Sequence, residues 1–519
     1  MKYIDYVQLN PFQKIGYNLK TFFLALPSNL VKIGKAIGRF FKKLGIGIGK
    51  GVAGYFSRLV KGDWATKLSY IIMGFGHIMK GQIIKGIIFL LTEVAFIAFM
   101  IGFGWHKIYN FGFFNPDHNI GFSGEGYPID VNGNNANETG LRPVGFHDGD
   151  NSMQLLLYGV LTFVIIALFL VVYFTSVKSA YKLEQQVAAG EKPKKFAQEM
   201  KAFGDEKFHV SLLAFPSLTI SAFTILPMIF MILIAFTNFT AQSTFFGWVG
   251  FANFAEIFQS TGGANKGETF VELTKWTLIW AVAATVLNYI LGMIVALLIN
   301  KKGIKLKALW RTLFVVTVAV PQFVSLLLMQ QMLEGNEFGA FNQILQSLGL
   351  LSTDAGGAVQ YVHFLDDLNK WIPRLTVIVV NIWVGIPYTI LITSGILMNI
   401  PADLYESATI DGAGPMRTFF SITLPYMLFV TTPYLITSFI GNINNFNVIY
   451  LLVGEQNSEH LHNAGYTDLL VTWLFRMSTS TGEYNTAATV GILVFIVCAT
   501  VSLLTFNLTK SAKNEEEFS

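Results

Sequence analysis

Polar side chains recur at helical spacing inside two long apolar segments, 374–398 and 427–451. Residues at i, i+4 and i+7, or at i and i+3, share one face of a helix. This spacing puts Asn381, Val384, Gly385 and Tyr388 on one face in the first segment, and Ser438, Asn442 and Asn445 on one face in the second. Asparagine amides can hydrogen-bond sugar hydroxyls, and a tyrosine ring can stack on a pyranose. A buried amide in a membrane needs such a ligand or a partner on another helix, and both interpretations stay open.

The sequence lacks the residue patterns of several other chemistries. It contains no G-x-x-x-x-G-K-[ST] phosphate loop, so no ATPase site is expected. No catalytic residues are predicted, and the histidines in 459–462 are typical of polar surface, so no metal site is predicted either. Glu93 is the only carboxylate placed well inside an apolar segment, where it would pair with a neighbouring helix or with Lys85. Coupled carriers usually need more buried charges, which disfavours a stand-alone secondary transporter.

The composition is that of a chain surrounded by lipid. Of its 519 residues, 53% are apolar and only 13% are charged, which is about half the charged share of soluble proteins. The single cysteine, Cys498, excludes a disulfide framework within the chain. The net charge of +4 is small, and no nucleic-acid partner is expected.

Eight segments are apolar over the roughly 20 residues that a membrane-spanning helix needs. They are 83–105, 154–177, 212–238, 276–300, 308–334, 374–398, 427–451 and 487–508. The segment 308–334 is the weakest because it contains Pro321 and three glutamines. The stretch 68–79 is too short to cross and is predicted to form a short interfacial or buried helix. The expected fold is therefore an all-α polytopic membrane protein.

Basic residues are concentrated in alternate connections between these segments. They crowd the N-terminus, the connections 178–207 and 301–307, and the C-terminal end. The intervening connections contain less lysine and more Asp, Asn and Gly. The positive-inside rule therefore predicts both termini in the cytoplasm, together with the connection 399–426.

Residues 1–66 form a basic region ahead of the first span. Within it, 29–45 alternates apolar and basic residues at nearly helical spacing, which predicts an amphipathic helix with one cationic face. Such a helix would lie on the inner leaflet, held by anionic membrane lipids. A solvated tether is the alternative interpretation.

The connection 399–426 combines a short helical pattern with glycines and prolines. Gly412 is placed to end a first helix, and Pro415 to begin a second. A helix–turn–helix of this kind would make a compact knob, on which Glu406 offers a charge to an arginine partner. The pattern predicts a docking surface for a cytoplasmic partner, with an ordinary connecting loop as the alternative.

The order of residues in this connection resembles the EAA signature of ABC-importer permeases. The matching residues are Glu406, Ser407, Ala408, Asp411 and Gly412. Ser407 stands where the family usually has a second alanine. The resemblance implies that 401–425 is a coupling loop, which docks on a separate cytoplasmic ATPase.

Three further stretches, 381–388, 442–452 and 464–476, resemble the maltose/maltodextrin permease subunits of the MalF type. The resemblance implies a type I ABC-importer permease in the bacterial cytoplasmic membrane, which moves maltose or maltodextrin inward. The partners it implies are a second permease of the MalG type, an ATPase homodimer of the MalK type and an extracytoplasmic sugar-binding protein. ATP and magnesium would be held by the ATPase, so no cofactor is expected in this chain. A permease for another oligosaccharide or a glycerol-phosphate-like solute is the alternative.

The same resemblance assigns substrate binding. Family members hold maltose midway across the membrane with the positions of Asn381, Gly385, Tyr388, Asn442 and Asn445. Gly385 would then border a cavity that a leucine at this position fills. The chain departs from the family by having Val318 and Gln322 in place of Tyr and Ser, and by lacking the large outer domain of enteric relatives between the third and fourth spans.

These observations divide the chain into four expected regions. They are the basic N-terminal region 1–66, the first two spans with their flanking loops 67–210, the permease core 211–510 and the cytoplasmic tail 511–519. The core contains the coupling loop and all the proposed site residues.

Overall fold

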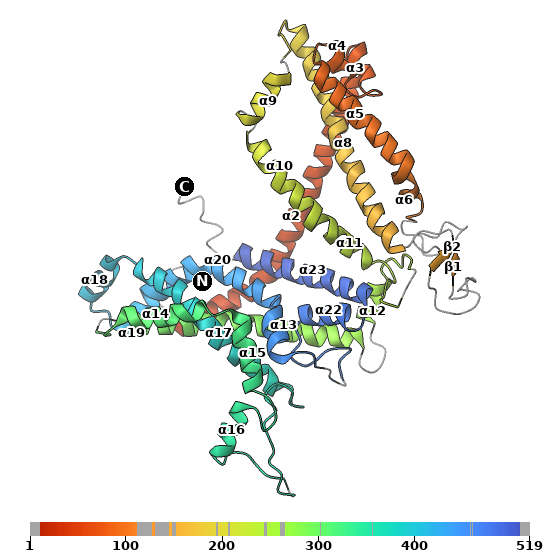
Figure 1. Cartoon of the computed structure of the whole chain (residues 1–519). Helices are drawn as coiled ribbons and strands as arrows, with labels where there is room; N and C mark the ends of the chain where they lie inside the picture. Colours follow the sequence, from red (N-terminus) through yellow and green to blue (C-terminus); the bar gives the residue numbers. More distant parts are fainter. Residues whose placement is uncertain are drawn as a thin grey trace. The chain divides into compact units, whose positions relative to one another are not determined.

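The computed structural model describes most of the chain, and Figure 1 shows its elements. The described residues are 11–111, 127–129, 145–147, 152–193, 196–205, 208–242, 246–259, 265–301, 303–354, 356–456, 458 and 460–508. They are almost entirely helical; the exception to the expected all-α fold is an antiparallel pair of three-residue strands, β1 (Tyr127–Ile129) and β2 (Gly145–His147). The chain forms two compact units. Unit 1 comprises 1–34, 254–481 and 490–519, and unit 2 comprises 35–253 and 482–489.

Seven helices in the described residues are long and apolar enough to span a membrane. They are Ile83–Tyr109, Ser152–Ala188, Phe208–Ile234, Lys266–Asn300, Trp371–Met398, Pro415–Ile443 and Tyr484–Leu503. The remaining expected span, 308–334, is a pair of helices, α14 (Lys307–Val318) and α15 (Gln322–Met332), bent by 85°. Pro321 stands in the break; proline has no N–H for the helical ladder, and its ring restricts the residue before it. Counting the pair as one span gives the eight that the sequence predicts.

The expected helix over 427–451 is wrong in its position. Helix α20 (Leu424–Ile443) ends before Asn445, which is the N-cap of a separate helix, α21 (Phe446–Val453). The Asn445 side chain accepts a hydrogen bond from the Val448 backbone N–H at 3.3 Å. Asparagine favours this position because its oxygen satisfies an N–H that has no partner within the helix. Asn442 and Asn445 therefore stand on different elements.

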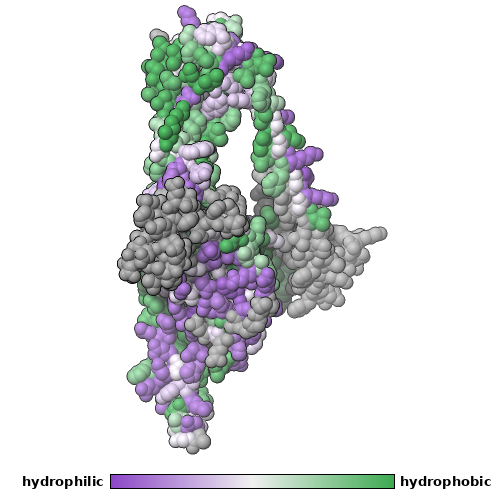
Figure 2. Space-filling view, turned by 90° about the vertical axis from the view of Figure 1, so that its right-hand side faces the viewer, coloured by the Kyte–Doolittle hydropathy of each residue, from purple (hydrophilic) through white to green (hydrophobic). Residues whose placement is uncertain are grey.

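Unit 2 is built around two long apolar helices. These are α5 (Ile83–Phe99), continued by η1 (Met100–Gly104) and α6 (Trp105–Tyr109), and α8 (Ser152–Ala188). Phe96 and Phe169 stack with ring centroids 3.7 Å apart, and Figure 1 shows α5 beside α8. Figure 2 shows hydrophobic side chains covering much of the upper surface in that view. Unit 2 also contains α9 (Phe196–Gly204), α10 (Phe208–Ile220), η2 (Ser221–Ile225) and α11 (Leu226–Ile234), together with two short helices near its start.

The stretch 68–79 folds differently from the single short helix expected. It contains the end of α3 (Trp64–Leu68) and all of α4 (Phe75–Met79), joined by a turn that includes Gly74 at φ +82°. A Cβ at Gly74 would lie 2.1 Å from the Gly86 carbonyl oxygen, so the close approach of these backbones requires glycine. Glu93 accepts a hydrogen bond from the Met73 backbone N–H at 2.7 Å, which ties this turn to α5. Lys85 instead pairs with Glu199 at 2.9 Å, so the expected Glu93–Lys85 alternative is wrong.

His77 gives unit 2 a dependence on pH. It is fully buried in α4, and its Nε2 lies 3.0 Å from the Ser179 hydroxyl. Burial lowers the pKa of His77 from 6.5 to about 4. Because the unfolded chain takes up a proton that the folded chain excludes, this stabilisation is complete above pH 6.5. It is lost toward about pH 4, by about 1.4 kcal/mol per pH unit.

We therefore expect the unfolding midpoint of the purified protein to fall between about pH 7 and about pH 5 more steeply than that of His77→Gln. Glutamine keeps a group able to bond Ser179 and does not titrate. Thermal unfolding in detergent measures both proteins. The exposed residue His460 provides the control, because His460→Gln should keep the wild-type pH dependence. Equal pH slopes in wild type and His77→Gln would contradict the assignment.

Unit 1 packs its helices around α13 (Lys266–Asn300). This helix lies against α17 (Trp371–Met398) and α20, and its residues Trp276 and Trp280 belong to the buried core. Glycines bring the first pair close, since a Cβ at Gly292 would lie 2.6 Å from the Thr389 side chain. The remaining described helices of unit 1 are α16 (Ala340–Ser347), α18 (Ala402–Ile410), α19 (Pro415–Thr418), η3 (Phe419–Thr423) and α22 (Leu470–Thr479).

Three helices have residues in both units. They are α2 (Pro11–Lys61), α12 (Ala252–Phe258) and α23 (Tyr484–Leu508). The helix expected over 29–45 is confirmed as part of α2, which is 51 residues long. Its location on the inner leaflet stays a prediction.

Candidate functional site

Two of the three asparagines of the predicted pocket, Asn442 and Asn445, are hydrogen-bonded within the protein. Asn442 donates from Nδ2 to the Thr285 hydroxyl on α13 at 3.0 Å, and Asn445 donates to Asn442 Oδ1 at 3.3 Å. The Trp280 indole N–H also donates to the backbone carbonyl of Asn442 at 3.1 Å. These contacts join α13 to the end of α20 and the start of α21. The interhelical interpretation of Asn442 therefore has direct support, and a ligand would have to share or replace these bonds.

The predicted residues on α17 have different surroundings. Asn381 is 5% exposed, and its Nδ2 has no hydrogen-bond partner among the described residues. Tyr388 is 54% exposed, and its ring centroid lies 6.3 Å from that of Tyr434 on α20. A buried unpaired amide is unfavourable, and the exposed Tyr388 ring beside the half-buried Tyr434 ring presents flat apolar surface. Both features suit a polyhydroxylated ligand.

Gly385 does not border open space. A Cβ built on it would lie 2.6 Å from Asn288 Nδ2 and 2.8 Å from Asn288 Cγ, on the neighbouring helix α13. The expectation that a leucine here would fill a cavity is therefore wrong, because the side chain would push α13 and α17 apart. Gly385 allows the close packing of the helices that support the pocket. Two of the residues that depart from the family, Val318 and Gln322, flank the bend: α14 ends at Val318 and α15 begins at Gln322.

The predicted coupling loop has the expected helix–turn–helix form. Helix α18 ends in a Schellman motif: the Gly412 N–H bonds the Thr409 carbonyl at 3.1 Å, and the Ala413 N–H bonds the Ala408 carbonyl at 2.9 Å. Gly412 has φ +71°, a left-handed conformation that side chains disfavour. Pro415 then opens α19 at its first position.

The loop presents apolar side chains to its surroundings. Ile410 is 86% exposed and Met416 is 71% exposed, and Leu404 is also exposed. The signature residues Glu406, Ser407, Asp411 and Gly412 are exposed, whereas Ala408 is half-buried. The Tyr405 hydroxyl lies 3.0 Å from the Thr423 hydroxyl and ties α18 to η3. Several exposed apolar side chains on a knob that is predicted to face the cytoplasm are typical of a protein-binding surface.

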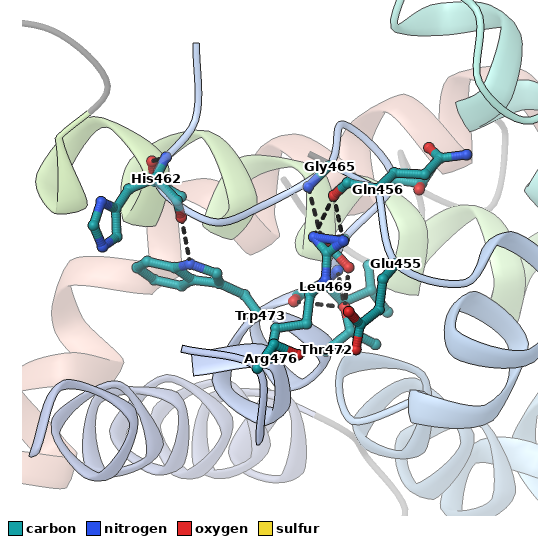
Figure 3. A network of polar contacts seen from close by, with 12 residues as sticks. Glu455, Gln456, His462, Gly465, Leu469, Thr472, Trp473 and Arg476 are labelled. Carbon is teal, nitrogen blue, oxygen red and sulfur yellow. Dashed lines mark hydrogen bonds and ion pairs between the residues drawn. The ribbon is translucent and has the colours of Figure 1, made fainter. Parts of the chain in front are cut away.

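A buried ion pair ties Gln456 and Gly465, in the connection before α22, to that helix. Arg476 Nη1 lies 2.6 Å from Asp468 Oδ2, and each side chain is 5% exposed. Asp468 also accepts from the Gly465 N–H at 2.7 Å and the Thr472 hydroxyl at 2.9 Å. Arg476 further donates to the Gln456 carbonyl, and Figure 3 shows its guanidinium directed at Gln456. The sequence stretch 464–476 contains both charges, but nothing in their spacing marks them as buried partners.

This stretch lines a cavity that the sequence analysis missed. The cavity has a volume of about 830 Å³, and its lining includes Glu272, Trp371, His460 and Tyr466. Glu272 pairs with Lys370 at 2.9 Å and with Arg374 at 3.0 Å. The cavity lies at the first turns of α13 and α17, the ends predicted to face the outside of the cell. Aromatic rings and charged hydrogen-bonding groups together suit a polar ligand or partner on that side.

Comparison with known proteins decides the family. Residues 288–511 match the family described as "Binding-protein-dependent transport system inner membrane component". The galactooligosaccharides transport system permease protein GanP of Bacillus subtilis (strain 168) is 32% identical over 452 residues, which cover 86% of this chain and 97% of GanP. The chain is a permease subunit of this family. It is a multi-pass membrane protein whose long apolar helices agree with that membership.

Two further permeases are similar to this one. The maltodextrin transport system permease protein MdxF of Bacillus subtilis (strain 168) is 30% identical over 466 residues, covering 88% of this chain and 98% of MdxF. The maltose/maltodextrin transport system permease protein MalF of Klebsiella aerogenes is 33% identical over 267 residues, covering 50% of this chain and 49% of MalF. The expected resemblance to MalF-type permeases is confirmed.

Proposed function

We propose that this permease carries maltodextrins into the cytoplasm as one subunit of a complex that hydrolyses ATP. The single observation that carries the coupling is the exposed knob of α18 and α19, with Gly412 in the left-handed conformation and Ile410 at the surface. An ATPase dimer of the MalK type would receive this knob, and a second permease of the MalG type would complete the pathway. An extracytoplasmic binding protein would deliver the sugar, in keeping with the description of the family.

Residues on α17 and α20 support a sugar as the transported solute. Tyr388 and Tyr434 offer ring faces, and the buried Asn381 amide has a donor to spare. Asn442 and Asn445 would join them if sugar hydroxyls exchange with the bonds to Thr285 and between the two amides. MdxF and MalF, both similar to this chain, are named for maltodextrin.

A panel of sugars added to the assembled complex in proteoliposomes tests the proposal. With the binding protein present, maltodextrins should raise the rate of ATP hydrolysis, and sucrose or glycerol phosphate should not. Stimulation by none of the glucose oligomers would reject maltodextrin as the substrate. Transport by this chain without any ATPase subunit would reject the whole assignment.

A galactooligosaccharide is the second candidate because GanP, which is named for that substrate, matches nearly its full length. The two candidates differ in the stereochemistry and linkage of the sugar, not in the number of hydroxyls. Equal panels of maltodextrins and β-linked galactooligosaccharides in the same assay separate them.

Tyr388→Ala and Asn442→Ala should fail in different ways. Tyr388 is exposed, so its loss should lower transport several-fold with little effect on the stability of the subunit. Asn442→Ala removes two amide bonds and leaves the Thr285 hydroxyl without its donor, which should cost about 1–3 kcal/mol of stability. Transport as a function of sugar length, and thermal unfolding in detergent, are measured on both proteins.

Asn444→Ala is the matched control for this comparison, because among the described residues the Asn444 side chain donates a single hydrogen bond, to the Cys498 sulfur at 3.6 Å, a distance typical of a weak bond. It should change neither quantity strongly. If Asn442→Ala leaves the unfolding midpoint intact but shifts the preferred sugar length, Asn442 acts on the ligand. If Tyr388→Ala transports normally, the ring pair is not part of the pathway.

A further inference from the structure

A cavity of about 710 Å³ lies between α2 and α8 within unit 2. The apolar side chains of Ile48, Val52 and Phe56 line it from α2, and Phe174 lines it from α8. Arg58 and Lys178 also line it, one from each helix. The cavity is therefore mostly apolar and carries two cations.

The two helices run in the same direction along this cavity. Tyr55 on α2 bonds Tyr173 on α8, with 2.9 Å between the hydroxyl oxygens, and further along the Asp63 N–H bonds Glu184 at 3.0 Å. Helices α2 and α8 are therefore parallel, and Arg58 and Lys178 lie at the same end of the cavity, after Tyr55 and Tyr173 respectively. The opposite end, near Ile48, lies toward the apolar middle of α8, where 163–172 contains no charged residue. The charge pattern of the sequence predicts that the cationic end faces the cytoplasm.

Hydrogen bonds between three tyrosines hold the walls of the cavity in place. Besides the Tyr55–Tyr173 bond, the Tyr173 hydroxyl donates to the Tyr70 carbonyl and the Tyr70 hydroxyl donates to the Tyr55 carbonyl, both at 2.9 Å. Tyrosine rings with polar tips are typical of the depth at which lipid headgroups lie. The cavity therefore exists without a ligand and does not need one in order to form.

The cations at the cavity are not neutralised by the nearby carboxylates. Asp63 and Glu184 face Lys80, at 2.9 Å and 4.0 Å. Arg58 lies against Gly54, where a Cβ would be 3.2 Å from Nη1, and its Nε has no partner in the described residues. The cationic end thus keeps a positive charge and a free donor.

We propose that this cavity binds one anionic phospholipid of the inner leaflet. The phosphate lies between Arg58 and Lys178, and an acyl chain follows Val52 and Ile48 toward the middle of the bilayer. Phospholipids have this polarity, with a charged group at the interface and an apolar chain directed inward. The site places Ile48 within the bilayer, and α2 is unbroken from Pro11 to Lys61, so this site and the predicted location of 29–45 on the inner leaflet exclude each other.

Gly51 on α2 allows the cavity to be filled without disturbing its walls, and Gly49 on the same helix provides the control. Gly51 lines the cavity and Gly49 does not, and a Cβ on either would meet nothing within 4 Å. Gly51→Phe should occupy the place of the acyl chain, whereas Gly49→Phe, about 160° away around the helix, should not. Displacing two methylene groups lowers binding about 15-fold, so a larger loss is expected for Gly51→Phe.

The headgroup is tested by charge. Lys178→Gln should lower the affinity for an anionic lipid about fivefold, and Lys178→Gln with Arg58→Gln about 25-fold. Lys50→Gln removes an equal charge from α2 outside the cavity and is the control. The full chain is purified in detergent, titrated with phosphatidylglycerol or phosphatidylcholine, and the number of bound lipids is counted by native mass spectrometry.

The proposal expects one phosphatidylglycerol to remain on wild type, Gly49→Phe and Lys50→Gln after the others dissociate, and to be lost from Gly51→Phe. Equal retention of phosphatidylcholine would overturn the anionic selectivity. Unchanged retention by Gly51→Phe would overturn the cavity as the site. A circular dichroism spectrum and an unfolding midpoint equal to those of wild type show that each variant is folded. If Gly51→Phe does not fold, Lys178→Gln still tests the site, because Lys178 is exposed and its replacement should leave the fold intact.

Discussion

Gly412→Pro is expected to lower transport by at least about 30-fold while the permease still inserts and assembles. Gly412 has φ +71°, which proline cannot adopt, and proline also removes the N–H that bonds the Thr409 carbonyl. The Schellman motif would open, and α18 would no longer be fixed relative to α19. Because Ile410 and Met416 extend from these helices, the docking surface would lose its shape. Sugar uptake and sugar-stimulated ATP hydrolysis by the complex measure the effect.

Gly303→Pro is the matched control for this variant. Gly303 has φ +96° and lies in the short connection between α13 and α14, predicted to be on the same side of the membrane. Gly303→Pro should therefore keep most of the transport activity. Equal losses of transport in the two variants would show that strain in any cytoplasmic turn is enough to stop transport. If Gly412→Pro transports normally although its loop is altered, the coupling role of this loop is wrong.

Arg476→Met is expected to destabilise the subunit by about 3–5 kcal/mol. The substitution leaves the Asp468 carboxylate buried without its cation, and the Gln456 carbonyl without its donor. Gln456 would lose its partner on α22, close to the cavity lined by His460 and Tyr466. Removing both charges in Arg476→Met with Asp468→Leu should restore a large part of the stability, because a buried pair repays its own desolvation only in part. Thermal unfolding of the three proteins in detergent measures these differences.

Lys370→Met provides the control, because the Lys370–Glu272 pair lies close by but is partly exposed, with 39% of the lysine side chain accessible. Exposed ion pairs contribute about 0–1 kcal/mol, so its unfolding midpoint should stay near wild type. Equal losses in Arg476→Met and Lys370→Met would show that burial of the first pair carries no special energy.

Much of the architecture follows from the sequence alone. A membrane core offers no water to backbone groups, so runs of about 20 apolar residues must form helices, and seven of the expected spans are single helices that cover most of the predicted segments. The helix–turn–helix form of the predicted coupling loop also follows from the sequence. Gly412 and Pro415 have backbone preferences that act within a few residues, and the structure uses both at the predicted places.

Only the tertiary structure decided how polar groups are satisfied. Hydropathy treats 427–451 as one run, whereas the chain breaks at Asn445, whose side chain caps the next helix and whose amide bonds Asn442. Glu93 bonds the Met73 backbone, which only the folded turn brings within reach. Gly385 meets Asn288 on another helix, and this contact depends on how α13 and α17 cross.

The same reason applies to the charges. In the sequence, Asp468 and Arg476 are two charged residues near a predicted membrane surface, with no sign that they are partners. In the folded protein they form a buried ion pair. The cavity between α2 and α8 likewise joins Arg58 to Lys178 across more than a hundred residues of sequence. Hydrophobic periodicity and turn-forming residues act over one or two helical turns, so they can be recognised in a single sequence. Pairing between distant polar side chains depends on the packed arrangement of helices, and therefore only the structure shows it.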